Sequence, residues 1–303
     1  MSNTSKPPVV RKAVIAAAGF GTRFLPQTKA MPKEMLPLVD KPIIQYIVEE
    51  LVEAGIEDIV IVTGYHKRSV EDHFDNMSAD LRSNLTKAGK SQLLEQTKAI
   101  SSLANFAYVR QKGPYGSATP VKNVAHLIGH EPFIYTFADD LIVAKPNRFK
   151  QMIDLYERLN GIILPCIKLD QDDQYDRYGV VAGQAVEPGI IKMSQLVEKP
   201  GKQAAPSNLA SVGAYLLTPD VFEYIDRGIA SLPDGKEFYL TDYVLQPMIE
   251  AGKPVYGCEM SNGIYYDTGN KLDYVKTVVD FALQHPEIKD DFSQFIRQKA
   301  AEL

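Results

Sequence analysis

Two aspartate motifs in this sequence have the composition of a divalent-cation site. Asp139 and Asp140 directly follow the apolar run 132–138, and Asp267 lies in a second motif, Tyr-Asp-Thr-Gly-Asn. In an open α/β sheet the carboxyl ends of the strands face the ligand crevice. Carboxylates at such an edge suit Mg²⁺, which takes oxygen ligands and shares them with substrate phosphates. The sequence leaves open whether the motifs meet, and Asp139–Asp140 could equally cap a helix or form a turn.

A glycine-containing loop near the N-terminus could bind phosphate. Residues 11–41 carry six basic side chains and two acidic ones, although the whole chain has a formal net charge of −5. Gly19 and Gly21 allow main-chain N–H groups to approach an anion. The loop has Phe24 where a dinucleotide-binding loop has its third glycine, and it lacks the Gly-Lys-Ser/Thr of a P-loop. Pro26 and Pro32 predict a long extended flap. The local charge favours phosphate binding over the alternative of a glycine turn with solvated lysines.

Two further motifs offer groups that could bind the organic parts of a ligand. Gln111 follows an apolar run, and its amide can both donate to and accept from a pyrimidine edge. Glu198 can accept hydrogen bonds from sugar hydroxyls, and Lys199 can hold a phosphate. In isolation the Glu198–Lys199 pair is better explained as an exposed charged pair on a solvated surface.

Composition excludes several classes of protein. The 303 residues are 45% hydrophobic and 23% charged, which is ordinary for a globular chain, and the acidic balance disfavours nucleic-acid binding. No apolar run reaches the ~18 residues of a membrane span, and the polar N-terminus does not resemble a signal peptide. We therefore expect a cytoplasmic protein with no membrane partner. Cys166 and Cys258 predict buried free thiols, and the five histidines are too scattered for a metal site.

The hydrophobic pattern predicts an α/β fold, a Rossmann-like doubly wound mixed sheet with an antiparallel extension. In the first half, strands alternate with helices. In the second half, strands are separated by Gly, Pro and Asp instead. Strands are expected at 13–18, 58–63, 106–111, 132–138, 161–169, 179–182, 190–197 and 211–217. Helices are expected at 42–54, within 66–103, and at 121–128, 147–159, 220–227, 240–251 and 271–285, followed by an amphipathic tail ending at Leu303.

Several motifs together resemble one enzyme family. The stretch AAGFGTRFLPQTKAMPKEMLPLVDKPIIQY, residues 17–46, is similar to the Gly-x-Gly-Thr-Arg and Pro-Lys signature of sugar-nucleotide pyrophosphorylases, of the nucleotide-diphospho-sugar transferase fold. Its TKAMPKEM form is most similar to the uridylyl-transferring branch, and the match continues to YYDTGNK at 265–271. The resemblance implies synthesis of UDP-glucose and pyrophosphate from UTP and glucose 1-phosphate, with Mg²⁺ assisting in-line attack on the α-phosphorus. It also implies a homo-oligomer, a dimer or a tetramer.

The resemblance further implies a role for individual residues. Asp139 and Asp267 would bind the metal, and Arg23, Lys33 and Lys199 would be catalytic. The implied nucleotide-binding residues are Ala18, Gly19, Gly21, Thr22, Glu34, Gln111 and Gly116. The implied sugar-phosphate-binding residues are Gly179, Glu198, Lys199 and Gly213. We expect a single nucleotidyltransferase domain over 1–303, with a nucleotide-binding half (about 12–145), a sugar-phosphate-binding half (about 146–270) and C-terminal helices (about 271–303).

Three alternatives stay open at this stage. Residues 117–120, Ser-Ala-Thr-Pro, depart from the Leu-Gly-His-Ala of the glucose enzymes, so dTTP or another sugar 1-phosphate is a competing substrate. A non-catalytic UDP-sugar sensor is a second alternative, although the presence of both Asp139 and Asp267 argues against it. A nicotinamide-dependent dehydrogenase is the third, and Phe24 disfavours it.

Overall fold

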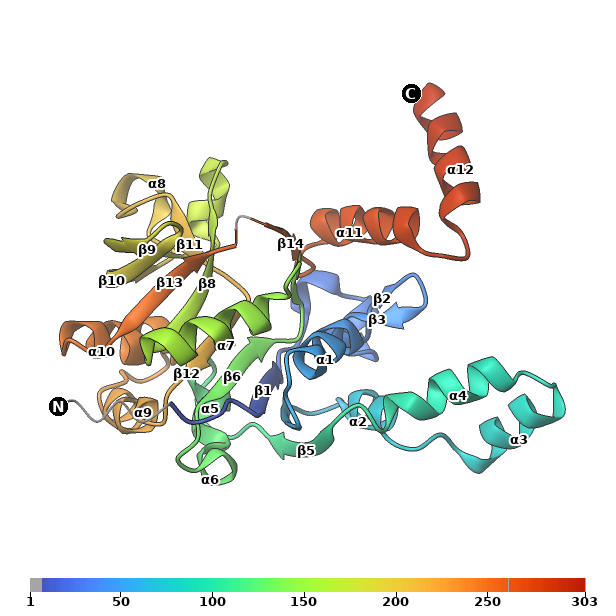
Figure 1. The fold of residues 1–303 in the computed structure, drawn as a ribbon, viewed down its shortest axis with the longest axis horizontal. Coiled ribbons are helices and arrows are strands. Elements are labelled where there is room, and N and C mark those ends of the chain that lie inside the picture. Colours follow the sequence, from blue (N-terminus) through green and yellow to red (C-terminus); the bar gives the residue numbers. More distant parts are fainter. Residues whose placement is uncertain (1–6, 261, 303) are drawn as a thin grey trace.

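One large mixed sheet organises the chain (Figure 1). The computed structural model describes residues 7–260 and 262–302. The strands of this sheet are β1 (Lys12–Ala17), β4 (Asp58–Thr63), β5 (Asn105–Arg110), β6 (Phe133–Phe137), β8 (Ile162–Lys168), β9 (Gly179–Glu187), β10 (Ile190–Glu198), β11 (Leu209–Ser211), β12 (Ala214–Leu217) and β13 (Val255–Glu259). Their order is β11-β9-β10-β13-β8-β12-β6-β1-β4-β5. The N-terminal segment 1–6 and Leu303, which entered the sequence predictions, lie outside the described residues.

The first half is a parallel sheet covered by helices on both faces. Strand β1 pairs in parallel with β4 and with β6, and β4 pairs in parallel with β5. Ile15 packs into the core cluster that contains α1 (Ile43–Glu53) and α7 (Arg148–Leu159). The preceding residue of the strand, Val14, packs into the opposite cluster, with α5 (Ala118–Asn123) and α9 (Val221–Ala230). Adjacent side chains of a strand point to opposite faces, so the predicted doubly wound fold is confirmed.

The second half is the predicted antiparallel extension, with one addition. Strand β8 pairs with β12 and β11 along one edge and with β13 along the other. Because β11 also pairs with β9, β9 with β10, and β10 with β13, the pairings return to β8 and close a ring. The pairing of β13 with β8 is parallel, whereas the sequence predicted an antiparallel extension in this half of the chain.

Two short strands outside the large sheet matter most for the site. Strand β7 (Asp140–Ala144) pairs antiparallel with β14 (Gly263–Asp267). A smaller ribbon, β2 (Pro37–Leu38) with β3 (Lys41–Pro42), follows the glycine loop. Strand β7 was not predicted, because it follows β6 after only two residues and the apolar runs of the two strands are interrupted only by Asp139 and Asp140.

The remaining helices surround this framework. They are α2 (Arg68–Phe74), α3 (Ala79–Lys87), α4 (Ser91–Ile100), α6 (Ala125–Ile128), α8 (Gly201–Ala204), α10 (Gln246–Glu250), α11 (Lys271–Gln284) and α12 (Lys289–Ala301). Helices α3 and α4 form an arm that projects from the sheet, and α12 turns away from α11 (Figure 1). None of the helices within 7–260 and 262–302 combines the length and apolarity needed to cross a membrane. Cys166 and Cys258 are buried and unpaired, as predicted.

Candidate active site

A cleft of about 510 Å³ brings together groups from both halves of the chain. Eight of the residues with implied roles line it: Arg23, Lys33, Asp139, Gly179, Glu198, Lys199, Gly213 and Asp267. Residues without an implied role line it too, among them Asp140, Arg177, Tyr178, Tyr239 and Tyr265. The cleft lies where the parallel half of the sheet meets the antiparallel extension, so strands distant in sequence contribute to one site.

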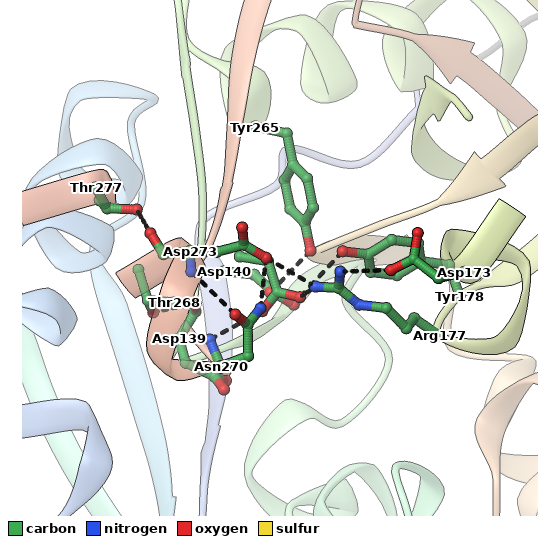
Figure 2. Close-up of polar contacts among 12 residues, drawn as sticks. Asp139, Asp140, Asp173, Arg177, Tyr178, Tyr265, Thr268, Asn270, Asp273 and Thr277 are labelled. Atoms are coloured by element: carbon green, nitrogen blue, oxygen red, sulfur yellow. Dashed lines mark hydrogen bonds and ion pairs between the residues drawn. The ribbon is translucent and has the colours of Figure 1, made fainter. Parts of the chain in front are cut away.

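The ladder between β7 and β14 places the aspartates together. Asp140, the first residue of β7, is paired in register with Asp267, the last residue of β14. Thr268 then donates hydrogen bonds from its backbone N and its Oγ1 to the carbonyl oxygen of Asp139. The Gly269 N–H donates to Asp267 Oδ1 over 2.8 Å, which orients that carboxylate. Three aspartates, Asp139, Asp140 and Asp267, therefore line one cleft, and Figure 2 labels the first two of them. Asp139 lies in the turn between β6 and β7, as the turn alternative expected, and the helix-cap alternative is wrong, since a strand follows.

The third member of this cluster, Asp140, was not assigned a role from the sequence. The Tyr265 hydroxyl donates to Asp140 Oδ1 over 3.0 Å. Burial raises the pKa of Asp140 to about 7, and the negative charges of Asp139 and Asp267 add to this effect. Close carboxylates repel each other when all are ionised, so the cluster favours positive charge.

Two basic side chains supply such charge in this structure. Lys33 Nζ lies 2.5 Å from Asp139 Oδ2. Burial lowers the pKa of Lys33, but the attraction of Asp139 and Glu34 outweighs burial and raises the pKa above its usual value. The lysine therefore remains charged at neutral pH. Arg177 contacts Asp267 through Nη2. The same nitrogen lies 3.2 Å from Asp273 Oδ2, and Figure 2 labels Arg177 and Asp273.

Arg177 is a site residue that sequence reasoning missed. It directly precedes the Tyr178–Gly179 motif, and this position was the one signal that could have found it. Its guanidinium links the segment before β9 to β14 and to the start of α11, while the Tyr178 hydroxyl donates to the same Asp267 oxygen over 3.0 Å. Asp267 is therefore held from three directions, counting the Gly269 N–H.

The basic flap is more ordered than the predicted extended loop. It contains three short 3₁₀ turns, Thr22–Phe24, Gln27–Lys29 and Lys33–Met35, because the prolines prevent a continuous helix but not single turns. A side chain at Gly269 would come within 3.0 Å of Arg23 Nη2. Arg23 therefore lies against the Gly269 backbone, next to Asp267 and at the rim of the cleft.

Residues that the resemblance assigns to nucleotide binding have surroundings that differ from those of the cleft residues. Gly19 and Thr22 line a second cavity of about 310 Å³ beneath the flap, with Lys67 also on its wall. Glu34 is fully buried, and Lys67 Nζ contacts its two carboxylate oxygens at 2.8 and 3.0 Å. Burial raises the pKa of Glu34 despite the lysine. The contacts of Glu34 hold the flap on α2, so a direct role in nucleotide binding stays a prediction.

The structure gives three other residues with an implied role in nucleotide binding contacts through their backbone atoms. Ala18 lies against Gly64, whose added Cβ would be 3.0 Å from the Ala18 carbonyl oxygen, and the Thr28 hydroxyl donates to the Gly21 carbonyl over 2.7 Å. Gln111 continues the ladder of β5, since its N–H donates to the Thr63 carbonyl over 2.9 Å. Ala18, Gly21 and Gln111 are not among the residues that line the two cavities described above.

Gly116 has a clear structural requirement. Its φ is +129°, and a Cβ there would lie 2.3 Å from the Phe238 carbonyl oxygen and 2.5 Å from the Phe238 nitrogen. Two backbone hydrogen bonds fix this approach, from the Phe238 N–H to the Tyr115 carbonyl and from the Ala118 N–H to the Phe238 carbonyl. The loop after β5 is thereby joined to the segment before α10.

We expect Gly116→Ala to lower the free energy of unfolding by about 2–4 kcal/mol, since it adds a backbone clash to the strain of a positive φ. Urea denaturation measures this loss. Gly113→Ala is the matched control, because its φ is +119° while its nearest neighbour would lie 3.5 Å from the new Cβ. Equal losses in the two variants would contradict the steric explanation.

A second group of residues that line the cleft offers contacts for a polar ligand. Gly179 and Glu198 are partners in the β9–β10 ladder, so Glu198 lies beside a backbone without a side chain. The Thr241 hydroxyl donates to Glu198 Oε2 over 3.2 Å, and burial raises the pKa of Glu198. Lys199 Nζ lies 3.6 Å from Glu198 Oε1 and 5.3 Å from the centre of the Tyr239 ring. The side chain of Glu198 is only 18% exposed, whereas that of Lys199 is 45% exposed, so the glutamate alone departs from a solvated surface pair.

The donor set of the cleft fits a divalent cation that is shared with a ligand. In the part of the chain that the structure describes, no three His, Cys, Asp or Glu side chains form a complete metal-binding group. Mg²⁺ commonly takes only one or two protein carboxylates and completes its shell with phosphate and water oxygens. Asp139 and Asp267, on the same wall of the cleft, meet that requirement.

Comparisons with known proteins agree with this site. Residues 12–283 match the nucleotidyl transferase family. The chain therefore belongs to the nucleotidyl transferase family. It is 44% identical over 289 residues to the UTP–glucose-1-phosphate uridylyltransferase of Staphylococcus epidermidis, covering 95% of this chain and 98% of the relative. It is 45% identical over 287 residues to the enzyme of the same name from Bacillus subtilis, covering 95% and 96%.

Solved structures give the same result. A UTP-bound UDP-glucose pyrophosphorylase from Acinetobacter baumannii superposes with a TM-score of 0.85 at 34% identity, over 95% of this chain and 99% of that one. A UDP-glucose pyrophosphorylase in complex with UDP-glucose superposes with a TM-score of 0.80 at 37% identity, over 91% and 100%. Family membership removes the dehydrogenase alternative.

Proposed function

We propose that this chain transfers the uridylyl group of UTP to glucose 1-phosphate, forming UDP-glucose and pyrophosphate. The observation that carries the proposal is a single cleft that is lined by the flap cations Arg23 and Lys33, the aspartate cluster and the Glu198–Lys199 pair. The names of the relatives at 43–45% identity support the same reaction.

The residues of the cleft suit a direct displacement. A phosphate oxygen of glucose 1-phosphate attacks the α-phosphorus of UTP, the bond to the β-phosphate breaks, and pyrophosphate leaves. The attacking phosphate is already ionised near neutral pH, so the site needs no strong base. Arg23 and Lys33 hold the triphosphate, and Lys199 steers the incoming phosphate. Catalysis then consists of positioning and charge neutralisation.

We assign Asp139 and Asp267 to Mg²⁺. When bound, the ion would neutralise charge on the reacting phosphates, as is general in phosphoryl and nucleotidyl transfer. Without a ligand, Lys33 and Arg177 neutralise these two carboxylates in its place. The lysine can then exchange its aspartate contact for a phosphate oxygen, while Arg177 keeps Asp267 oriented.

The remaining assignments are part of the same proposal. Residues 12–145 contribute the nucleotide-binding half, 146–270 the sugar-phosphate-binding half, and 271–303 the C-terminal helices. Gly179, Glu198 and Gly213 contact the sugar phosphate, and Gln111 reads the base. We further propose a homo-oligomer, a dimer or a tetramer, that works in the cytoplasm.

A substrate matrix tests the proposal. Pyrophosphate release is measured with UTP, dTTP, ATP and GTP against glucose 1-phosphate, galactose 1-phosphate and other hexose 1-phosphates in Mg²⁺. We expect the highest kcat/KM for UTP with glucose 1-phosphate. A preference for dTTP would overturn the nucleotide assignment and implicate residues 117–120. Tight UDP-glucose binding without any turnover would favour the sensor instead.

A further inference from the structure

Two large aromatic side chains meet in the open beside the flap. Phe20 is 63% exposed and Tyr115 is 60% exposed, yet their ring centres lie only 5.6 Å apart at a tilt of 56°. They come from different loops, Phe20 from the turn after β1 and Tyr115 from the loop after β5. Neither ring belongs to a hydrophobic core cluster. The contact thus joins two loops over the surface without contributing to the core.

The two rings differ in how firmly their backbones are held. Tyr115 accepts a 2.6 Å hydrogen bond at its carbonyl from the Phe238 N–H, and the close approach of Gly116 to Phe238 fixes the next residue. Phe20 lies between Gly19 and Gly21, and glycines give the backbone more freedom than other residues. The backbone at Tyr115 is therefore held directly, whereas Phe20 lies between two glycines.

The surroundings of the pair point to a flat ligand with a phosphate group. Phe20 lines the cavity beneath the basic flap, together with Gly19 and Thr22. Tyr115 lies between Gln111 and Gly116 in the loop to which we assign base recognition. In proteins that bind single-stranded nucleic acid, exposed aromatic side chains stack on bases, because every base offers a flat π-face. The same contact is open to the base of a nucleotide.

We propose that Phe20 and Tyr115 form an aromatic clasp on the base of the bound nucleotide. The tilted rings contact each other in the free protein, and on binding one ring exchanges this contact for the base. Stacking is tolerant of base identity, so the clasp contributes affinity while Gln111 and its neighbours select the base. This inference rests on the proposed function only in requiring a nucleotide as ligand.

A single-tryptophan reporter tests the clasp. The chain has no tryptophan, so Phe20→Trp introduces a unique indole fluorophore. We expect its emission to change on titration with UTP or UDP, and not with pyrophosphate or glucose 1-phosphate alone. Phe295→Trp, on α12, where Phe295 is 48% exposed, is the matched control and should report neither ligand. Unchanged emission of the Phe20→Trp variant, at UTP concentrations that saturate it by calorimetry, would overturn the clasp.

Truncation gives a second, independent readout. Phe20→Ala and Tyr115→Ala should each weaken UTP binding on the order of tenfold by calorimetry, with the dissociation constant for glucose 1-phosphate changed far less. Phe295→Ala should leave both constants unchanged. Calorimetry measures binding whether or not turnover occurs. If the wild type shows no uridylyl transfer but the two variants bind UTP more weakly than the wild type, the proposed function is overturned and the clasp is not. Normal turnover with unchanged UTP binding in both variants would overturn the clasp alone.

Discussion

Replacement of Asp139 by asparagine is expected to lower kcat by about 10²–10³-fold, which is typical for the loss of one charge-stabilising group in a protected site. Asp139 Oδ2 accepts a hydrogen bond from Lys33 Nζ over 2.5 Å, and the Asp139 backbone carbonyl accepts one from the Thr268 hydroxyl. The amide retains the shape of the side chain but cannot neutralise a cation. Pyrophosphate release at saturating UTP and glucose 1-phosphate, over a range of Mg²⁺ concentrations, measures the effect.

The matched control for this change is Asp172→Asn. Asp172 is a carboxylate with 73% of its side chain exposed, its partner is Lys202, and neither residue lines the cleft. It should retain full activity. Mn²⁺ affinity, measured by titration calorimetry in the presence of UDP, separates a lost metal ligand from a distorted site. Unchanged turnover and unchanged Mn²⁺ affinity in Asp139→Asn would remove the residue from the proposed site.

Lys33→Met is expected to lower kcat/KM for UTP by about 10²–10³-fold, because the proposed clamp loses a buried charge directed at the triphosphate. Methionine keeps most of the volume of the lysine stem. The expected loss concerns UTP more than glucose 1-phosphate, since the contacts proposed for the sugar phosphate are with Glu198 and Lys199, which also line the cleft. Initial rates with one substrate varied at a time measure this difference.

Removal of Lys33 also leaves Asp139 without its cation, so stability must be measured in parallel. Thermal melting separates a destabilised variant from a folded, inactive one. Lys87→Met, at the end of the projecting helix α3, is the control for loss of a lysine and should behave as the wild type. A folded Lys33→Met protein with a normal KM for UTP and a normal kcat would contradict the triphosphate clamp.

Most of the fold could be predicted because long apolar runs were available. The 58–63 run became β4 and the periodic 42–54 segment became α1, since each pattern covers a complete element. Strand β7 escaped prediction because only two residues separate it from β6, so its apolar run did not stand out as a separate element. The closure of the ring at β8 could not be predicted either, since pairing between strands distant in sequence depends on the whole sheet.

The candidate site could be predicted in part for a similar reason. Arg23, Lys33 and Asp267 stood in motifs with a recognisable order, and the structure brings them to one cleft. Asp140 and Arg177 had no motif role of their own. Their importance arises from contacts with Tyr265 and Asp267, which lie 125 and 90 residues away in sequence. The structure also gives Glu34 and Gly116 structural contacts that their motifs did not indicate.

The class of fold and the types of chemical group available to it follow from the amino-acid sequence alone, because hydrophobic period and residue type are local properties of the chain. Which of these groups meet is set by tertiary packing. The β7–β14 register places Asp140 opposite Asp267, and a shift of one residue would turn the aspartate side chain to the other face. The close approach of Gly116 to Phe238 likewise holds Tyr115 beside Phe20. Such arrangements depend on contacts between distant segments, which local sequence does not specify.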